Sequence, residues 1–158
     1  MGGTIAPEAP PAGFVEIHRW ELTSTEDLAR LRSSLHHALT GAPVPADRSL
    51  DEVPERIVLV ASELATNALR HARPPTLVRL LSDGREYVVD VVDHAPEDPP
   101  VVVHGRPPGG GGYGLLLAQR ICLDVGWYPA PVGRKHVWAR FAVPDHGRTT
   151  ARRARRDP

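Results

Sequence analysis

The chain of 158 residues lacks features that mark several classes of protein. It contains one cysteine, Cys122, so no internal disulfide framework can form, and its Cys and His residues show no metal-site spacing. Lysine plus arginine and aspartate plus glutamate both number 19, which leaves no overall charge to attract nucleic acid or a membrane. These absences favour a protein of the reducing cytosol that binds a small molecule or another protein.

Long apolar runs are also absent. The N-terminus has no charged segment followed by an apolar stretch, so we expect no signal peptide. No continuous run approaches the ~18 apolar residues that a membrane helix needs. We therefore expect a cytoplasmic protein without a membrane partner.

The composition is nevertheless sufficient for one folded domain. A hydrophobic content of 41% and this length suit a single core, since compact domains commonly have ~100–150 residues. Residues 1–13 hold three prolines and three glycines and have little to bury, which predicts a disordered leader. The folded domain is then expected over 14–144, followed by a disordered tail over 145–158.

The tail holds five arginines against two aspartates. Termini of this kind are usually solvated and disordered. The other interpretation is a docking arm for an acidic partner or for nucleic acid. Nucleic-acid binding is the weaker reading, because the body of the chain has no basic stripe, and we expect no direct contact with nucleic acid.

Hydrophobic periodicity predicts the order of the elements. Strands and helices occur in separate runs, which predicts an α+β fold rather than a doubly wound parallel sheet. Asp83-Gly84 marks a hairpin turn, and residues 95–111 form an unusually long proline- and glycine-rich loop, typical of a lid. Helices are predicted over 23–40, 51–72 and 115–121, and strands over 14–20, 76–82, 86–92, 123–128 and 135–143.

The second predicted helix carries the strongest pattern. Apolar residues recur at spacings of three and four over 57–68, which places them on one face. Glu63, Asn67 and His71 follow one another at four-residue intervals and form a polar row beside that face. In a plain amphipathic helix such a row only reaches water, whereas on a helix that lines a cleft it points into the cleft.

Two further features follow in the chain. Asp93 ends a predicted strand, where an aspartate is also a common turn former. A glycine run, 109–114, precedes the third helix. Such a run is either a flexible linker or a phosphate site, because exposed backbone amides and the positive end of a helix attract phosphate.

Residues 62–72 read S-E-L-A-T-N-A-L-R-H-A, and this stretch resembles the N-box of the histidine-kinase-like (GHKL) ATPase superfamily, most closely its anti-sigma-factor serine/threonine kinase branch. The resemblance implies that Glu63 orients or deprotonates the attacking group and that Asn67 binds the Mg²⁺ of Mg-ATP. An amide oxygen is a hard ligand that suits this ion. By the same resemblance, Asp93 bonds to the adenine amino group, and Gly112 and Gly114 contact the phosphates.

The resemblance also has departures. Ala95 and Glu97 stand where the family's D-x-G-x-G motif has glycines, which removes backbone freedom from the expected lid hinge. In the last predicted strand, His136 stands where a threonine often touches the adenine site. His136 either donates a hydrogen bond there or only fills the core or the surface.

The implied fold, over about 14–143, is α+β: a two-layer sandwich of the GHKL (Bergerat) type, with a mixed, mostly antiparallel sheet and three helices on one face. The implied function is that of an ATP-binding anti-sigma-factor-like serine/threonine kinase. Its partners would be a sigma factor and an anti-sigma-factor antagonist, and the family commonly forms homodimers. The alternative is a degenerate module that binds a protein partner without turnover.

Overall fold

The computed structural model describes residues 2–4, 6–41, 52–94, 101–103 and 113–142. Its main feature is a five-stranded sheet in the order β2-β3-β4-β7-β6, and every neighbouring pair in it is antiparallel. The strands of this sheet are β2 (Val15–Leu22), β3 (Thr76–Ser82), β4 (Glu86–Asp93), β6 (Asp124–Ala130) and β7 (Arg134–Ala142). The helices are a short 3₁₀ turn, η1 (Thr25–Asp27), and α1 (Leu28–Thr40), α2 (Val53–His71) and α3 (Tyr113–Ile121).

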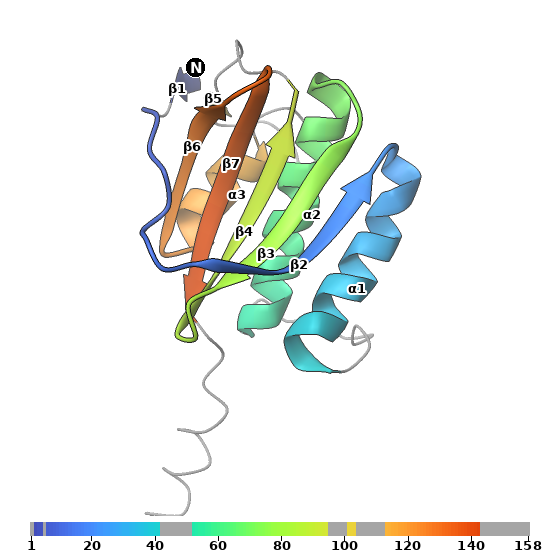
Figure 1. The fold of residues 1–158 in the computed structure, drawn as a ribbon, viewed down its shortest axis with the longest axis vertical. Helices are drawn as coiled ribbons and strands as arrows, with labels where there is room; N and C mark the ends of the chain where they lie inside the picture. Colours follow the sequence, from blue (N-terminus) through green and yellow to red (C-terminus); the bar gives the residue numbers. More distant parts are fainter. Residues whose placement is uncertain (1, 5, 42–51, 95–100, 104–112, 143–158) are drawn as a thin grey trace, which may run out of the picture.

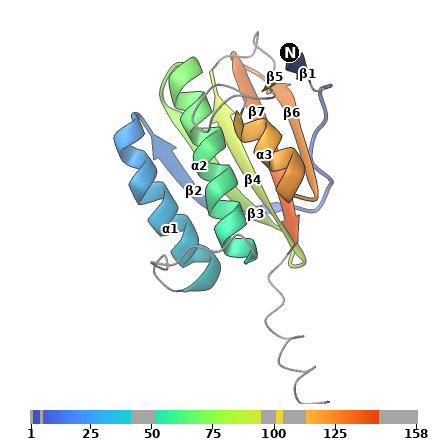
Figure 2. The ribbon, with the colours of Figure 1, turned by 180° about the vertical axis from the view of Figure 1, so that it is seen from behind.

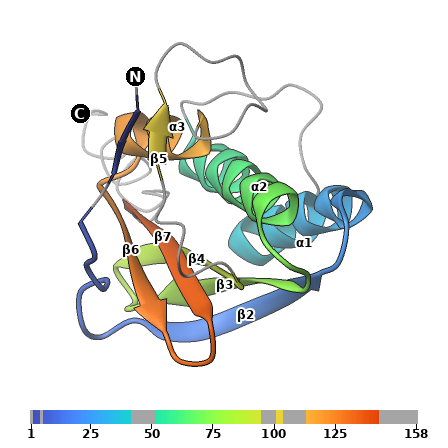
Figure 3. The same cartoon turned by 90° about the horizontal axis from the view of Figure 1, so that it is seen from above.

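This arrangement confirms the predicted α+β class and the predicted element types (Figure 1). The predicted sheet was mixed and mostly antiparallel. Among the described strands, every pair is antiparallel. Figures 2 and 3 show α2 lying along the middle of the sheet, with α1 and α3 beside it on the same side. Helix α2 contacts β3, β4 and β7 of the sheet, and it also contacts both α1 and α3.

Local sequence signals explain the boundaries of these elements. The backbone N–H of Thr23 and that of Ser24 donate to Asp27 Oδ2 at 2.9 and 3.3 Å, which closes the turn that leads into α1. Helix α1 ends at Thr40 and is capped by Gly41, whose φ of 72° is the left-handed conformation that glycine adopts most easily. Asp83 Oδ1 accepts two backbone hydrogen bonds at 2.8 Å and so fixes the β3–β4 hairpin.

The main core fills the space between the helices and the sheet. Helix α2 contributes its buried stripe, and the sheet contributes alternate residues of its central strands. The buried members from α2 and the central strands include Ile57, Val60, Ala61, Leu64, Val78, Leu80, Val89, Val91 and Val137. A smaller cluster of Leu81, Val88 and Trp138 lies on the opposite face of the sheet.

The N-terminal segment departs from the prediction of a disordered leader. Gly2–Thr4 form β1, which pairs antiparallel with β5 (Val101–Val103), a strand inside the segment predicted to be a loop. The backbone N–H of Glu8 donates to the Trp127 carbonyl at 2.7 Å, and Trp138 Nε1–H donates to the Glu8 carbonyl at 2.8 Å. The amino-acid composition of this segment does not reveal its ordered structure, because hydrogen bonds of its backbone, rather than buried side chains, hold it in place. The predicted tail over 145–158 lies outside the described residues.

Among the helices of the described residues, each is too short or too polar to cross a lipid bilayer.

Gly126 of β6 lies against the ring of Trp138, its neighbour on β7. A Cβ atom added at Gly126 would stand 2.5 Å from Trp138 Cζ2 and 2.7 Å from Cε2. The Trp138 side chain is fully buried and its Nε1–H is bonded to Glu8, so the ring has little freedom to move aside.

We therefore predict that Gly126→Ala lowers the free energy of unfolding by about 1–3 kcal/mol, the usual cost of overpacking. Urea unfolding followed by circular dichroism measures the change. In the Trp138→Phe background the smaller ring leaves room for the methyl group, so Gly126→Ala should cost less there. An equal cost in both backgrounds would show that the Trp138 contact is not the cause.

Candidate functional site

Helix α2 holds two of the predicted site residues. Glu63 and Asn67 are both half-buried, one helical turn apart, at the margin of the stripe that packs on the sheet. His71, the third residue of the predicted polar row, is exposed. The row is therefore sheltered at Glu63 and Asn67 and reaches solvent only at its C-terminal end.

Partial burial changes the acidity of Glu63. Desolvation raises the pKa of its carboxyl group above the ordinary value, and the positive charge of Arg70 offsets part of that rise. A carboxylate with a raised pKa is a stronger base than a carboxylate in water. This environment suits a residue that accepts a proton or holds a hydroxyl group.

The predicted contact of Asn67 with Mg²⁺ stays a prediction, and it can be compared with the way nucleotide sites usually bind this ion. Mg²⁺ keeps several waters and takes only one or two protein oxygens in addition to substrate phosphates. Within the described ranges, no group of three or more His, Cys, Asp or Glu residues could hold a metal ion. A half-buried amide that acts together with a nucleotide is consistent with both statements.

Asp93 ends β4 on the side of the sheet that faces the helices. Its neighbours of the same parity, Val89 and Val91, belong to the main core. Directly opposite Asp93 on β7 is Lys135, and the distance from Lys135 Nζ to Asp93 Oδ2 is 3.7 Å. Both side chains are deeply buried, with 10% of Lys135 and 5% of Asp93 exposed.

Lys135 is the neighbour of Asp93 that sequence reasoning missed. The sequence pattern draws attention to His136, but a shift of one residue along a strand moves a side chain to the other face of the sheet. Lys135 is two residues before the core residue Val137, so the alternation of the strand already places both side chains on the same face. That Lys135 lies opposite Asp93 is known only from the β4–β7 register.

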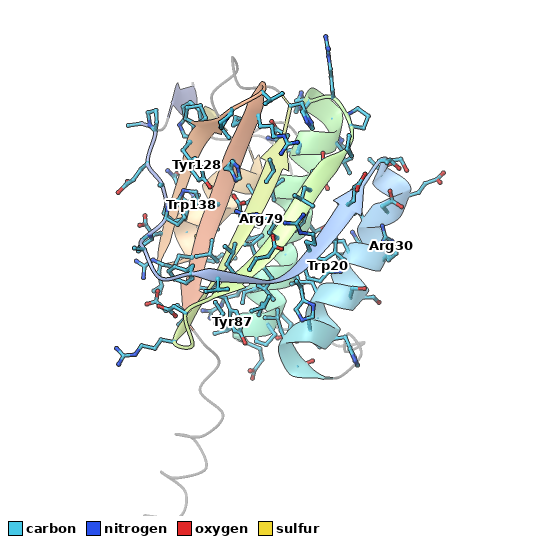
Figure 4. All side chains as sticks on the ribbon, viewed as in Figure 1. Trp20, Arg30, Arg79, Tyr87, Tyr128 and Trp138 are labelled. Carbon is cyan, nitrogen blue, oxygen red and sulfur yellow. The ribbon has the colours of Figure 1, made fainter. Side chains whose placement is uncertain are left out.

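His136 points to the face of the sheet away from the helices. Its Nδ1 atom lies 2.8 Å from Asp90 Oδ2, and its ring stacks on Tyr128 with ring centres 4.4 Å apart. Arg79 donates to the same Asp90 oxygen from Nε at 2.8 Å. Figure 4 shows Arg79, Tyr128 and Trp138 on this helix-free face. Of the two interpretations of His136, the structure favours the one in which it fills the surface, because His136 and Asp93 lie on opposite faces of the sheet.

The glycine-rich turn is described only in part. Helix α3 begins at Tyr113, so Gly114 is in its first turn, where backbone N–H groups have no partner within the helix. The predicted phosphate contact through Gly114 agrees with this position and stays a prediction. Gly112, Ala95 and Glu97 lie outside the described residues.

Comparison with known families agrees with this geometry. A family model of the histidine kinase-like ATPase domain matches residues 23–141, most of the chain. The matched range contains every residue assigned above to the site, from Glu63 on α2 to Lys135 on β7. A comparison with curated protein sequences found no match.

The raised pKa of Glu63 predicts a pH-dependent effect on stability. The folded protein binds the Glu63 proton more tightly than the unfolded chain does, so the native protein loses stability as pH rises from the ordinary carboxyl pKa through the raised one. Glu63→Gln removes that loss. The variant should therefore have the higher melting temperature at pH 7, and the difference should disappear below about pH 4.

Thermal unfolding of both proteins at a series of pH values measures this difference. Glu21→Gln is the matched control, since Glu21 lies exposed on β2 and should change the melting temperature little. A Glu63→Gln variant that is less stable than the native protein at pH 7 would contradict the prediction.

Proposed function

Because the chain belongs to the histidine kinase-like ATPase domain family, we propose that it is an ATP-binding regulator acting as an anti-sigma-factor-like serine/threonine kinase. One observation carries the proposal. Within the matched range, Glu63 and Asn67 share a sheltered margin of α2, and α2 packs on β4, whose last residue is Asp93. The placement of α1, α2 and α3 in Figure 3 supports a two-layer GHKL-type fold with its helices on one face.

Each residue has a defined role in the proposed reaction. Asp93 accepts a hydrogen bond from the nucleotide base, and the backbone N–H groups of Gly112 and Gly114 donate to the phosphates. Asn67 would hold Mg²⁺, which would neutralise phosphate charge. Glu63 orients the serine or threonine hydroxyl of the substrate protein and accepts its proton. Phosphoryl transfer needs chiefly this positioning and charge neutralisation.

The partners follow from the proposed branch of the family. The protein would sequester a sigma factor, release it by partner switching and phosphorylate an anti-sigma-factor antagonist, and so regulate transcription. A homodimer is the form expected for that branch.

A second function has its own support in the sequence. Ala95 and Glu97 replace the two glycines of the lid motif, which favours a degenerate module that binds a protein partner without turnover. The two functions differ in a simple measurement. A melting-temperature rise on adding Mg-ATP supports the kinase, whereas no rise in a folded protein supports the degenerate module.

We predict that Asn67→Ala weakens binding of Mg-ATP by at least about tenfold, because the variant loses the proposed protein ligand of the metal. Isothermal titration calorimetry with Mg-ATP measures the affinity. His71→Ala is the matched control, since His71 is on the same row of α2 but is exposed. Unchanged affinity in Asn67→Ala would contradict the assignment of Mg²⁺ to this residue.

A further inference from the structure

The N-terminal strap, residues 2–4 and 6–14, connects two sides of the molecule. At one end, Phe14 packs against the small apolar cluster on the helix-free face of the sheet. The Glu8 backbone N–H donates to the edge strand β6 at 2.7 Å, and the Glu8 carbonyl accepts from Trp138 Nε1–H at 2.8 Å. At the other end, residues 2–4 form β1, which pairs with β5. The strap therefore runs from the helix-free face, past the edge of the sheet, to β5.

Strand β5 depends on the strap for its strand pairing. Among the described strands, β1 and β5 form a two-stranded sheet of their own, and β5 does not join the five-stranded sheet. Their ladder runs from Gly2 opposite Val103 to Thr4 opposite Val101. The other element that β5 contacts closely is α3. Without β1, β5 would lose its backbone partner and would be held mainly by α3.

Strand β5 also lies next to the phosphate side of the proposed nucleotide site. In the chain it follows Asp93, which bonds to the base in the proposed function, and it precedes Gly114, which contacts the phosphates. In space it contacts α3, whose first turn contains Gly114. Figure 3 shows β1 and β5 side by side, next to α3. A displacement of β5 from α3 would therefore change access to the phosphates.

The two ends of the strap differ in stability. Phe14 rests on an apolar cluster, and Glu8 makes two backbone hydrogen bonds, one of them to the fully buried Trp138. The β1–β5 ladder has only three residue pairs, and a two-stranded ladder by itself is marginally stable in water. Elements with few buried contacts open much more often than the core. The strap can therefore release β5 while it stays bound at Glu8 and Phe14.

We propose that the N-terminal strap controls nucleotide exchange. Strand β1 pairs with β5 while a nucleotide is bound, and it separates from β5 when the nucleotide enters or leaves. The closed ladder holds β5 against α3 and so slows the release of Mg-ATP. The rate of release then depends on the fraction of molecules in which β1 is unpaired. This inference rests on the proposed function, because it needs a nucleotide between Asp93 and Gly114.

Two double variants of the full chain test this role. Backbone N–H groups of consecutive residues in a strand point to opposite sides, so either Gly3 or Thr4 donates towards β5. Gly3→Pro combined with Thr4→Pro removes that donor in both cases, because proline has no N–H. Gly3→Ala combined with Thr4→Ala is the matched control, since it keeps both N–H groups.

Stopped-flow displacement of a fluorescent ATP by excess Mg-ATP measures the rate of release. We expect the proline pair to raise this rate at least about fivefold, the order expected for the loss of one backbone hydrogen bond. The alanine pair should stay within about twofold of the native rate. An unchanged rate in the proline pair, or an equal rise in both pairs, would overturn the inference.

Amide hydrogen exchange tests the ladder itself and needs no nucleotide. The amides of Val101, Val102 and Val103 should exchange faster in the proline pair than in the alanine pair, because they lose β1 as a partner. Equal exchange in the two variants would show that β1 does not hold β5, and the inference would then be wrong.

The native protein gives a further measurement, in case the proline pair does not fold. Binding of Mg-ATP should slow amide exchange in β5, since the ladder is closed in the bound state. Unchanged exchange in β5 of the ATP-bound protein would contradict the proposed role of the strap.

The failure of this inference is distinguishable from the failure of the proposed function. If ATP binds and the proline pair releases it at the native rate, only the role of the strap fails. If no ATP binds to the folded native protein, the proposed function fails, and control of nucleotide exchange fails with it.

Discussion

The pairing of β4 with β7 is the interaction on which both the core and the candidate site depend. Its register sets Val91 against Val137 in the core and Asp93 against Lys135 one step beyond. Because side chains alternate across a strand, a slip of one residue would move all of them to the wrong face. The same hydrogen-bond ladder therefore stabilises the fold and brings Asp93 and Lys135 together.

The helix-free face of the sheet contributes to fixing that register. Asp90 is almost fully buried there, with 2% of its side chain exposed, and it receives Arg79 from β3 and His136 from β7. Both partners contact the same oxygen, Oδ2, at 2.7 Å and 2.8 Å. A shifted register would turn Asp90 towards the apolar core and separate it from these partners, at the high cost of a buried, unpaired charge. The cluster of Arg79, Asp90 and His136 thus disfavours alternative pairings.

Helix α2 links this sheet to the proposed chemistry. Its apolar stripe must pack on β3, β4 and β7, so its margin is partly shielded from water. That shielding raises the pKa of Glu63, which makes the carboxylate a better base and costs stability at neutral pH. The half-burial of Glu63 and Asn67 is therefore a consequence of the packing that builds the core.

The sequence by itself determined the α+β class, helix α2 with Glu63 and Asn67, and the β3–β4 hairpin, because local periodicity and turn chemistry encode them. Only the tertiary structure decided which residue faces Asp93. Lys135 and His136 are adjacent in the chain, and the pairing of strands far apart in sequence assigns them to opposite faces. The order of the N-terminal segment was equally hidden, because its backbone bonds to β6 and to β5 leave no hydrophobic pattern in the sequence.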